Sequence, residues 1–443
     1  MSVHSHYGLF LIVDVIMNLM YAVRSSLFYQ LRKLWKAKYA QWIWWKPWEA
    51  LEIIGVTWTD WKTSTCTVLS HMLHSLGYSV MMIWTNGVFV DGKEQQWVQK
   101  MTSYDPLDLQ RLLANAVDQW VSHVVMEVSS HGLDQQRFEW VPFRTAVLTN
   151  IAEEHLDYHP TMKHYIASKR KLFEKLQYAW RKAIAVFPAD DPVWRKREKK
   201  FQFKTEISYG LSASAKLSVK KIQYHPQSTS VQVQRSAESE PMTIPMIWAF
   251  NLRNTLAAMS VCLGFNHSLK EVIDAMKGYQ HAAWRQQYIN LDWTHCYIDF
   301  AHTPQGLEAM LTTLKHIQWS DAWKVICVFG APWKRDRKKR PQMAAIVEKY
   351  SDIMIVTDDD ASNEDRRRIL WDIHEWVSRQ LCDSYYCIPN RRDAISLACQ
   401  LVKPWDYLLL AWKWHEKVLV TNFGKKAWDD EKVLKEERGK NRE

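Results

Sequence analysis

The sequence contains little glycine. Its 443 residues include 13 glycines, less than half of the roughly 7% that an average protein has. Loops that surround a phosphate group need glycine, because its backbone reaches conformations that other residues avoid and because it lets the ligand approach closely. Taken literally, the sequence has few residues from which such a loop could be built.

Cysteine motifs and long apolar runs are also missing. The seven cysteines are odd in number and form no Cys-x-x-Cys pair, so we expect reduced, mostly buried thiols in a cytoplasmic protein. Residues 9–23 are mostly apolar, but Asp14 and Asn18 interrupt them, and no basic segment precedes them as in a signal peptide. Basic residues follow this stretch, which leaves two alternatives: a packed N-terminal helix, or a helix on the membrane surface.

The chain has an excess of basic residues. A net charge of +10 suits anionic ligands such as nucleotides. Nucleic acid is the rival interpretation, but the basic residues are scattered, and the runs at 196–200 and 366–368 are explained more simply as solvated faces. We therefore expect no nucleic-acid partner.

Tryptophan is present in excess. The chain has 25 tryptophans, and together with the glycines they approach the number expected for ordinary glycine plus a little tryptophan. We hypothesise that many of these residues are glycine in the living protein. A genome that reads the codon UGA as glycine would give this sequence if it were translated with a table that gives tryptophan. The alternative is a truly tryptophan-rich protein.

Residues 53–64, IIGVTWTDWKTS, have the pattern of a strand, a phosphate loop and a helix. Lys62 stands where such loops have the lysine that reaches the outer phosphates of ATP, and Thr63 where a hydroxyl holds Mg²⁺. Backbone N–H groups at the start of the helix would surround the anion. Trp58 and Trp61 contradict this interpretation, because an indole ring at either position would block the phosphate.

Strands and helices alternate along the rest of the chain. Expected strands at 79–83, 121–126 and 145–149 predict an α/β fold of the P-loop type, with a doubly wound, mostly parallel central sheet. Residues 208–246 suggest an antiparallel appendage to this domain. Strands at 325–329, 353–357 and 408–411 predict a smaller, Rossmann-like α/β domain.

We expect three parts in chain order. Residues 1–48 would form an N-terminal helix and a basic linker, residues 49–288 a central ATP-binding domain, and residues 289–443 a C-terminal domain. This division agrees with the two or three domains that the chain length allows.

Two acidic and histidine-bearing segments could bind metal. Glu127 ends a buried strand next to the phosphate-loop strand, where a carboxylate can share Mg²⁺ with Thr63. His155 and His159 have the spacing of a zinc pair, but no third ligand is apparent, so zinc is not expected.

With glycine in place of tryptophan, the loop becomes Gly-Val-Thr-Gly-Thr-Asp-Gly-Lys-Thr. Together with MEVSSHGLDQQR at 126–137, HLDYH at 155–159 and AWKWHE at 411–416, it resembles the Mur ligases, most closely the MurE type. The similar blocks extend from about Ile53 to Asp430. Eleven tryptophans fall where this family has glycine: Trp58, Trp61, Trp84, Trp120, Trp140, Trp248, Trp284, Trp333, Trp405, Trp412 and Trp414. Trp428 stands where the family commonly has an aromatic residue.

The resemblance implies an ATP site drawn from three parts of the chain: the phosphate loop, two asparagines that contact adenine, and a second cluster further along. Its members are Trp58, Thr59, Asp60, Trp61, Lys62, Thr63, Ser64, Asn251, Asn254, Arg285, Asp299 and His302. The resemblance also implies residues that contact the muramoyl peptide or the incoming amino acid. These are Thr102, Ser103, Ser129, Gln135, Arg137, Arg335, Asp359, Asp360, Lys413 and Glu416.

The implied catalytic residues are Lys62, Glu127, His155 and Lys169, and the implied Mg²⁺ ligands are Thr63, Glu127, His155 and Lys169. Lys169 matches the lysine that the family carbamylates. A carbamate replaces the cation by an anion, which could support Mg²⁺ near the transferring phosphate. The alternative is that Lys169 is an ordinary surface lysine.

The sequence departs from the family pattern in two places. Only about 50 residues precede the phosphate loop, so we expect a short form without the usual N-terminal domain that grips the uridine nucleotide. At 357–362, TDDDAS replaces the Asp-Asn-Pro-Arg of members that select diaminopimelate. Without that arginine, lysine or another amino acid is favoured, and Asp359 or Asp360 could pair with a cationic side chain.

We therefore predict an ATP-dependent ligase that adds an amino acid to UDP-N-acetylmuramoyl-L-Ala-D-Glu through an acyl phosphate, in peptidoglycan precursor synthesis. ATP and Mg²⁺ are the expected cofactors, and the protein is expected to be a cytoplasmic monomer. One alternative is a folylpolyglutamate-synthase-like ligase, against which the blocks at 126–137 and 411–416 argue. Another is a catalytically dead Mur-like scaffold, if the tryptophans of the loop are real.

Overall fold

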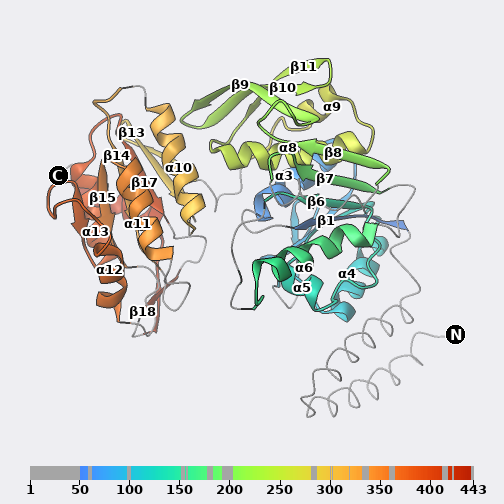
Figure 1. Ribbon diagram of the computed structural model, residues 1–443, viewed down its shortest axis with the longest axis horizontal. Helices are drawn as coiled ribbons and strands as arrows, with labels where there is room; N and C mark the ends of the chain where they lie inside the picture. The colour runs from blue at the N-terminus through green and yellow to red at the C-terminus, as the bar shows by residue number, and fades with distance from the viewer. Residues whose placement is uncertain are drawn as a thin grey trace, which may run out of the picture. The chain divides into compact units, whose positions relative to one another are not determined.

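The computed structural model (Figure 1) describes residues 50–57, 62–96, 101–150, 155, 158–176, 183–191, 203–280, 287–299, 301, 303–318, 320–331, 339–358, 365–411, 418–421 and 424–440. The expected N-terminal helix and linker lie outside these residues. Within them, no helix is both long enough and apolar enough to cross a membrane.

The chain divides into two compact units. The first consists of residues 1–220, 232–240 and 253–278, and the second of residues 221–231, 241–252 and 279–443.

An eleven-stranded sheet forms the centre of the N-terminal half, in the order β11-β10-β9-β8-β7-β6-β1-β5-β2-β3-β4. Its strands are β1 (Glu52–Thr57), β2 (Val80–Trp84), β3 (Gly87–Val90), β4 (Lys93–Gln95), β5 (His123–Glu127), β6 (Thr145–Leu148), β7 (Ile184–Pro188), β8 (Thr205–Tyr209), β9 (Leu217–His225), β10 (Ser228–Arg235) and β11 (Glu238–Ile244). The pairings from β2 through β5, β1, β6, β7 and β8 are parallel. The predicted α/β fold with a mostly parallel sheet is thereby confirmed.

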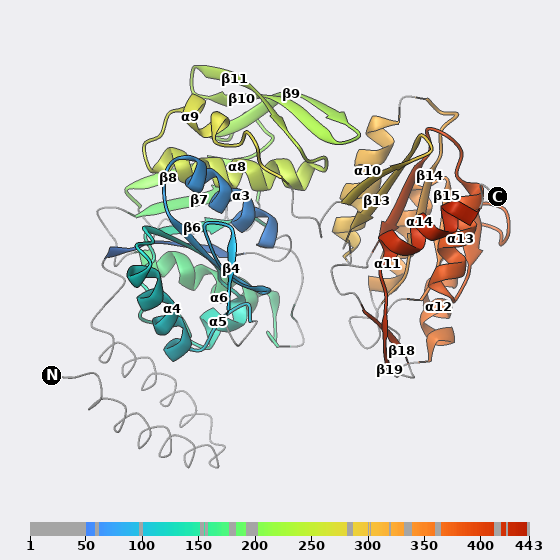
Figure 2. The ribbon, with the colours of Figure 1, turned by 180° about the vertical axis from the view of Figure 1, so that it is seen from behind.

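Helices cover both faces of this sheet (Figures 1 and 2). They are α3 (Lys62–Ser75), α4 (Pro106–Asp118), α5 (Ser130–Asp134), α6 (Met162–Lys175), α8 (Ala249–Gly264) and α9 (Leu269–Asp274). Helices α4, α5 and α6 share one core with β1 and β5, whereas α3 and α8 lie on the opposite face. Burial on both faces explains why the parallel strands are almost wholly apolar.

Gly55 allows α6 to approach β1 closely. A Cβ atom at this position would lie 2.7 Å from the Phe143 ring and 2.8 Å from Cδ1 of Leu172, closer than non-bonded carbon atoms pack. The absence of a side chain therefore sets the distance between β1 and the helix that carries Lys169.

A six-stranded sheet, in the order β12-β13-β17-β14-β15-β16, forms the C-terminal part. Its strands are β12 (Gln287–Leu291), β13 (Thr294–Asp299), β14 (Val325–Phe329), β15 (Ile353–Val356), β16 (Tyr385–Cys387) and β17 (Tyr407–Ala411). All pairs are parallel except β12 with β13. A two-stranded sheet, β18 (Val418–Thr421) and β19 (Gly424–Ala427), follows.

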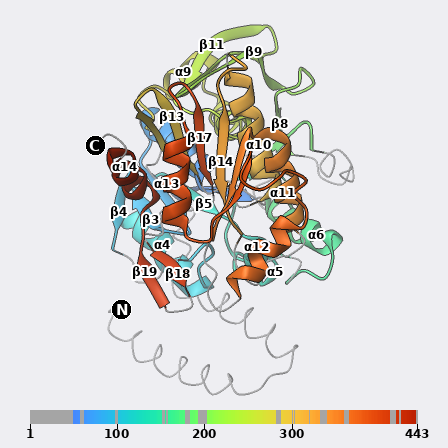
Figure 3. The same ribbon diagram turned by 90° about the vertical axis from the view of Figure 1, so that its left-hand side faces the viewer.

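Helices α10 (Pro304–Ile317), α11 (Lys339–Tyr350), α12 (Arg366–His374), α13 (Arg391–Leu401) and α14 (Asp430–Lys440) surround this smaller sheet. Helices α13 and α14 pack with its strands in one core, and α10 and α11 lie on the other face (Figure 3). The three strands predicted at 325–329, 353–357 and 408–411 are present as β14, β15 and β17, so the second, smaller α/β domain is also confirmed.

The first unit buries a histidine whose titration should govern its acid stability. His123 is 5% exposed and lies 4.2 Å from the Tyr78 ring and 5.3 Å from the Phe265 ring, between centroids. Burial lowers the pKa of His123 to about 4; Glu52 opposes this shift, whereas Arg144 and His267 add to it. The folded protein therefore keeps His123 neutral at pH values where the unfolded chain protonates it.

We predict that His123 makes the free energy of unfolding fall as the pH is lowered from about 6.5 toward 4. Between pH 7 and pH 5 its contribution should be about 2 kcal/mol. Urea unfolding at both pH values, compared between the parent chain and His123→Phe, measures it, because the other titrating groups are shared. Equal losses in the two proteins would contradict the assignment.

Candidate functional site

The carboxyl ends of β1 and β5 lie side by side and begin the candidate site. Glu127, the last residue of β5, is in register with Val56 of β1, and the Val128 N–H donates to the Val56 carbonyl at 2.9 Å. Strand β1 ends at Thr57 and α3 begins at Lys62. The predicted order of strand, short loop and helix is therefore present, with Glu127 next to the start of the loop.

The loop residues themselves are only partly described. Trp58, Thr59, Asp60 and Trp61 lie outside the described residues, as do the side chains of Lys62 and Thr63. The next residue, Ser64, is buried, and its carbonyl accepts a hydrogen bond from Thr67.

Thr85 holds the buried carboxylate of Glu127. Its hydroxyl donates to Oε2 of Glu127 at 2.8 Å, and its N–H lies 3.3 Å from the same oxygen. Glu127 is 1% exposed. Thr85 is not among the residues predicted from the sequence, although one signal was present: it follows β2, whose carboxyl end reaches the same edge of the sheet as that of β5.

The predicted substrate residues Thr102, Ser103, Ser129, Gln135 and Arg137 come together beside this carboxylate. The hydroxyl of Thr102 lies 2.9 Å from that of Thr85, and the hydroxyls of Ser103 and Ser129 are 2.8 Å apart. Arg137 donates to the Ser103 carbonyl at 2.5 Å and to Oε1 of Gln135 at 3.0 Å. The structure thus brings five of the ten predicted substrate residues together.

The short helix α5 supports this group. The Ser129 side chain caps its first turn by accepting from the Gly132 N–H at 3.0 Å. At Gly132 a Cβ atom would lie 2.8 Å from the Ser103 hydroxyl and 2.7 Å from the Phe138 ring, so only glycine lets the serines meet.

His155 has a backbone conformation that is uncommon for its residue type. Its φ is +57°, in the left-handed region that non-glycine residues seldom occupy. The His131 ring meets the His155 ring edge to face, with centroids 4.9 Å apart. Such strain is frequent at functional sites.

Lys169 is buried on α6 and is 2% exposed. Its amine lies 4.7 Å from the centroid of the Tyr165 ring, and the Tyr165 and His155 ring centroids are 6.3 Å apart. The alternative that Lys169 is an ordinary surface lysine is therefore wrong.

The remaining predicted residues are more widely distributed. Asn251 and Asn254 are buried on α8, and Asn251 donates to the Ile247 carbonyl at 3.4 Å. Asp299 ends β13 and is 3% exposed. Outside the described residues lie Arg285, His302, Arg335, Asp359, Asp360, Lys413 and Glu416.

No three His, Cys, Asp or Glu side chains gather as a metal site in the part of the chain that the structure describes. Hydroxyl, backbone carbonyl and carbamate groups can also bind a metal, and they do not belong to these four residue types. The described candidate residues comprise the Glu127 carboxylate at the end of β5, the imidazole of His155 and the amine of Lys169 on α6.

Comparison with known proteins identifies this architecture. The family descriptions "Mur ligase middle domain" and "Mur ligase, glutamate ligase domain" match residues 56–262 and 284–411. A UDP-N-acetylmuramoyl-L-alanyl-D-glutamate–2,6-diaminopimelate ligase of Ectopseudomonas mendocina is 35% identical over 375 residues, which are 84% of this chain and 74% of the relative. The UDP-N-acetylmuramyl-tripeptide synthetase 2 of Oceanobacillus iheyensis is 33% identical over 393 residues, or 88% of this chain and 78% of the relative.

Solved structures share the fold. A UDP-N-acetylmuramoyl-L-alanyl-D-glutamate–2,6-diaminopimelate ligase superposes with a TM-score of 0.67 at 24% identity, covering 94% of this chain and 83% of the other. The sequence matches extend through both α/β parts of the chain. The chain belongs to the Mur ligase family of ATP-dependent, amide-forming ligases.

Proposed function

We propose that this chain joins an amino acid to the D-glutamate of UDP-N-acetylmuramoyl-L-Ala-D-Glu, using ATP and passing through an acyl phosphate. The observation that carries the proposal is the position of Thr85. Its hydroxyl contacts Glu127, beside the phosphate loop, and also Thr102, one of the predicted substrate residues. Nucleotide and acceptor would therefore meet at one edge of the central sheet.

The proposed reaction has two steps. An oxygen of the acceptor carboxylate attacks the γ-phosphorus of ATP, and ADP leaves. The amine of the incoming amino acid then attacks the acyl carbon, phosphate leaves and the nitrogen loses a proton, giving the amide. Lys62 would neutralise charge on the phosphates, and the residues of the site would act by positioning and charge stabilisation, as phosphoryl transfer requires.

The residues present suit Mg²⁺ by their chemistry. Mg²⁺ prefers oxygen ligands, and the predicted set offers the carboxylate of Glu127, the hydroxyl of Thr63 and a carbamate on Lys169, together with the imidazole of His155 as a nitrogen ligand. When bound, the ion would neutralise charge on the transferring phosphoryl group. Thr85 would orient the Glu127 carboxylate.

The segment 357–362 bears on which amino acid is added. The relatives include proteins named for diaminopimelate, but the segment 357–362 contains three aspartates and no arginine. A cationic side chain such as that of lysine is therefore the favoured ligand, and diaminopimelate is the competing one.

The function is tested with a chain that carries glycine at the eleven positions where the family has it. With Mg²⁺ and ATP, we expect phosphate release only when UDP-N-acetylmuramoyl-L-Ala-D-Glu and an amino acid are both present, and lysine and diaminopimelate are compared in parallel. Lys62→Ala should reduce the rate at least 100-fold, because it removes the positive charge that would neutralise the outer phosphates.

Two results would separate the alternatives. Phosphate release with a folate and glutamate instead would support the folylpolyglutamate-synthase-like ligase. No nucleotide binding by the glycine-bearing chain would support the inactive scaffold and overturn the proposal.

Backbone geometry supports glycine at several tryptophan positions. Trp120, Trp248 and Trp405 have φ values of +58°, +62° and +75°, where a bulky side chain is disfavoured. Trp248 is fully buried, and its indole N–H has no acceptor among the described residues. Trp293, which is not one of the eleven positions, also has a positive φ, +66°. Trp428, by contrast, donates its indole N–H to Asp430 at 2.7 Å.

We predict that the gene has UGA at Trp58, Trp61, Trp120, Trp248, Trp293 and Trp405, and UGG at Trp428. Peptides of the protein purified from its own cells should accordingly carry glycine at the first six positions and tryptophan at the last, as read by tandem mass spectrometry. UGG codons and tryptophan throughout would contradict the recoding hypothesis.

We also predict that Thr85→Val weakens metal binding, because the Glu127 carboxylate loses the hydroxyl that orients it. The concentration of Mg²⁺ that gives half the maximal rate should rise about 10- to 100-fold. Thr85→Ser keeps a hydroxyl and serves as the matched control, with a rise of less than about threefold. Equal behaviour of the two variants would exclude this role for the hydroxyl.

A further inference from the structure

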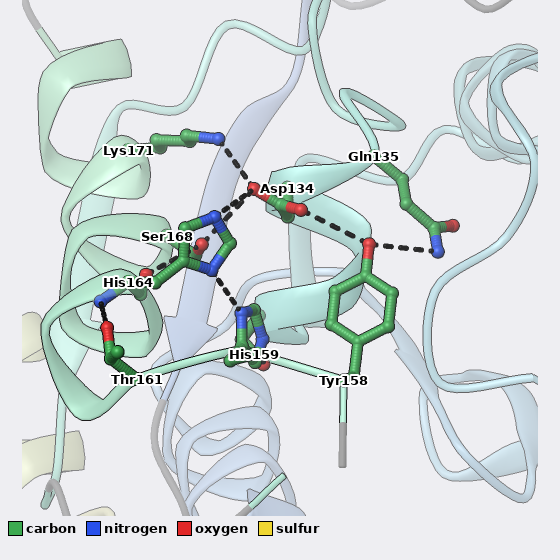
Figure 4. Close-up of polar contacts among 9 residues, drawn as sticks. Asp134, Gln135, Tyr158, His159, Thr161, His164, Ser168 and Lys171 are labelled. Carbon is green, nitrogen blue, oxygen red and sulfur yellow. Dashed lines mark hydrogen bonds and ion pairs between the residues drawn. The ribbon is translucent and has the colours of Figure 1, made fainter. Parts of the chain in front are cut away.

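Asp134 joins three segments of the first unit (Figure 4). It is the last residue of α5, and its carboxylate accepts from the Tyr158 hydroxyl at 3.1 Å, from the Lys171 amine at 3.0 Å and from the Ser168 hydroxyl at 3.3 Å. Tyr158 belongs to the 155–159 turn, whereas Lys171 and Ser168 belong to α6. One carboxylate therefore ties α5 to both the turn and the helix.

His159 forms a second connection among the same segments. Its Nε2 lies 3.0 Å from the Ser130 hydroxyl on α5, and its Nδ1 lies 2.9 Å from Nδ1 of His164 on α6. Nε2 of His164 is 3.7 Å from Oδ1 of Asp134. The two connections thus close a ring through Asp134, His164, His159 and Ser130.

The donors and acceptors of the ring restrict which atoms carry hydrogen. Of the two facing Nδ1 atoms, one must carry the hydrogen and the other must accept it. The carboxylate favours hydrogens on the atoms that face it, those of Tyr158, Ser168, Lys171 and His164. Burial would raise the pKa of Asp134, but hydrogen bonds and charge from Lys171, with the Tyr158 hydroxyl and the His164 charge, lower it overall. Asp134 is therefore a stable anion at neutral pH.

Each point of attachment is close in sequence to a residue of the proposed site. Ser130 follows Ser129, Ser168 precedes Lys169, and Tyr158 lies three residues after His155. Tyr158 also accepts from the Gln135 carboxamide at 3.4 Å. The network thus connects the turn that carries His155, the helix that carries Lys169, and Ser129 and Gln135 at the two ends of α5.

We propose that Asp134 and Tyr158 are positioning residues. They hold the turn that carries His155 against α5 and α6, and this fixes the position of the metal relative to the acceptor. This inference rests on the proposed function. Asp134 and Tyr158 would touch neither ATP nor the acceptor, and their effect would be transmitted through the turn and through Gln135.

A second carboxylate–lysine pair provides a matched control. Glu139 accepts from the Lys175 amine at 2.9 Å and so connects the segment after α5 to the end of α6. Neither residue contacts the 155–159 turn in the hydrogen bonds that the structure describes. Loss of this pair should loosen the same two elements without disturbing the turn.

The test compares Tyr158→Phe, Asp134→Asn and Glu139→Gln in the glycine-bearing chain. Tyr158→Phe keeps the aromatic ring beside His131, whose centroid is 4.1 Å away, and removes only the hydroxyl. Binding of Mn²⁺ in the presence of ADP, measured by electron paramagnetic resonance of the free ion, gives a readout that does not require turnover. The kcat and the KM values for ATP and acceptor give the second.

We expect Tyr158→Phe to weaken Mn²⁺ binding about 3- to 10-fold and Asp134→Asn about 10- to 100-fold. Both should raise the KM for the acceptor and leave the KM for ATP within about twofold, because the phosphate loop is not part of the network. Glu139→Gln should leave all of these values within about twofold, whatever its effect on the melting temperature.

The inference is overturned if the first two variants match Glu139→Gln in Mn²⁺ binding and in KM for the acceptor. A parent chain that binds Mn²⁺ and ADP but makes no amide would instead overturn the proposed function, and the Mn²⁺ comparison would still test the network. If circular dichroism shows that Asp134→Asn has lost its folded structure, Asp134→Glu takes its place. It keeps the negative charge and should retain part of the Mn²⁺ affinity.

Discussion

The parallel pairing of β1 with β5 is the constraint on which the site depends. It places Glu127 beside Val56, at the residue pair just before β1 gives way to the phosphate loop. Because the side-chain period of a strand is two, a shift of one residue would turn Glu127 to the other face of the sheet and bring Val128 or Met126 into its place. The apolar residues of both strands, buried on both faces, make such a shift costly.

The site is then extended by hydroxyl groups at neighbouring strand ends. Thr85 reaches Glu127 because β2 pairs with β5 on the side away from β1. Ser103 and Ser129 approach each other because Gly132 leaves room between α5 and the 101–104 segment. These hydrogen bonds give the buried Glu127 carboxylate and the buried Ser103 hydroxyl polar partners, as buried polar groups require.

The sequence was sufficient for the fold. Alternating apolar strands and helices predicted the two sheets, and the blocks around Glu127, His155 and Lys169 predicted the segments to which the candidate site is assigned. Thr85, Asp134 and Tyr158 were not predicted as functional, since their importance comes from contacts between segments 17 to 42 residues apart. Such contacts depend on how the elements pack and on side-chain rotamers, which periodicity does not encode. Lys169 illustrates the same limit: its burial depends on the packing of α6 against the sheet.

The excess of tryptophan would lower the stability of the fold as well as block the phosphate loop. A non-glycine residue in the left-handed region costs on the order of 1 kcal/mol, and four described tryptophans have positive φ values, Trp120, Trp248, Trp293 and Trp405. Together they would cost several kcal/mol, a large part of the roughly 5–15 kcal/mol that stabilises a folded protein. Glycine would remove this cost at each position, and at Trp58 and Trp61 it would also free the loop for phosphate. The composition, the left-handed backbone and the needs of the loop are thus three separate physical arguments for the same substitution, and a chain with tryptophan at all of these positions would be penalised both in folding and in binding.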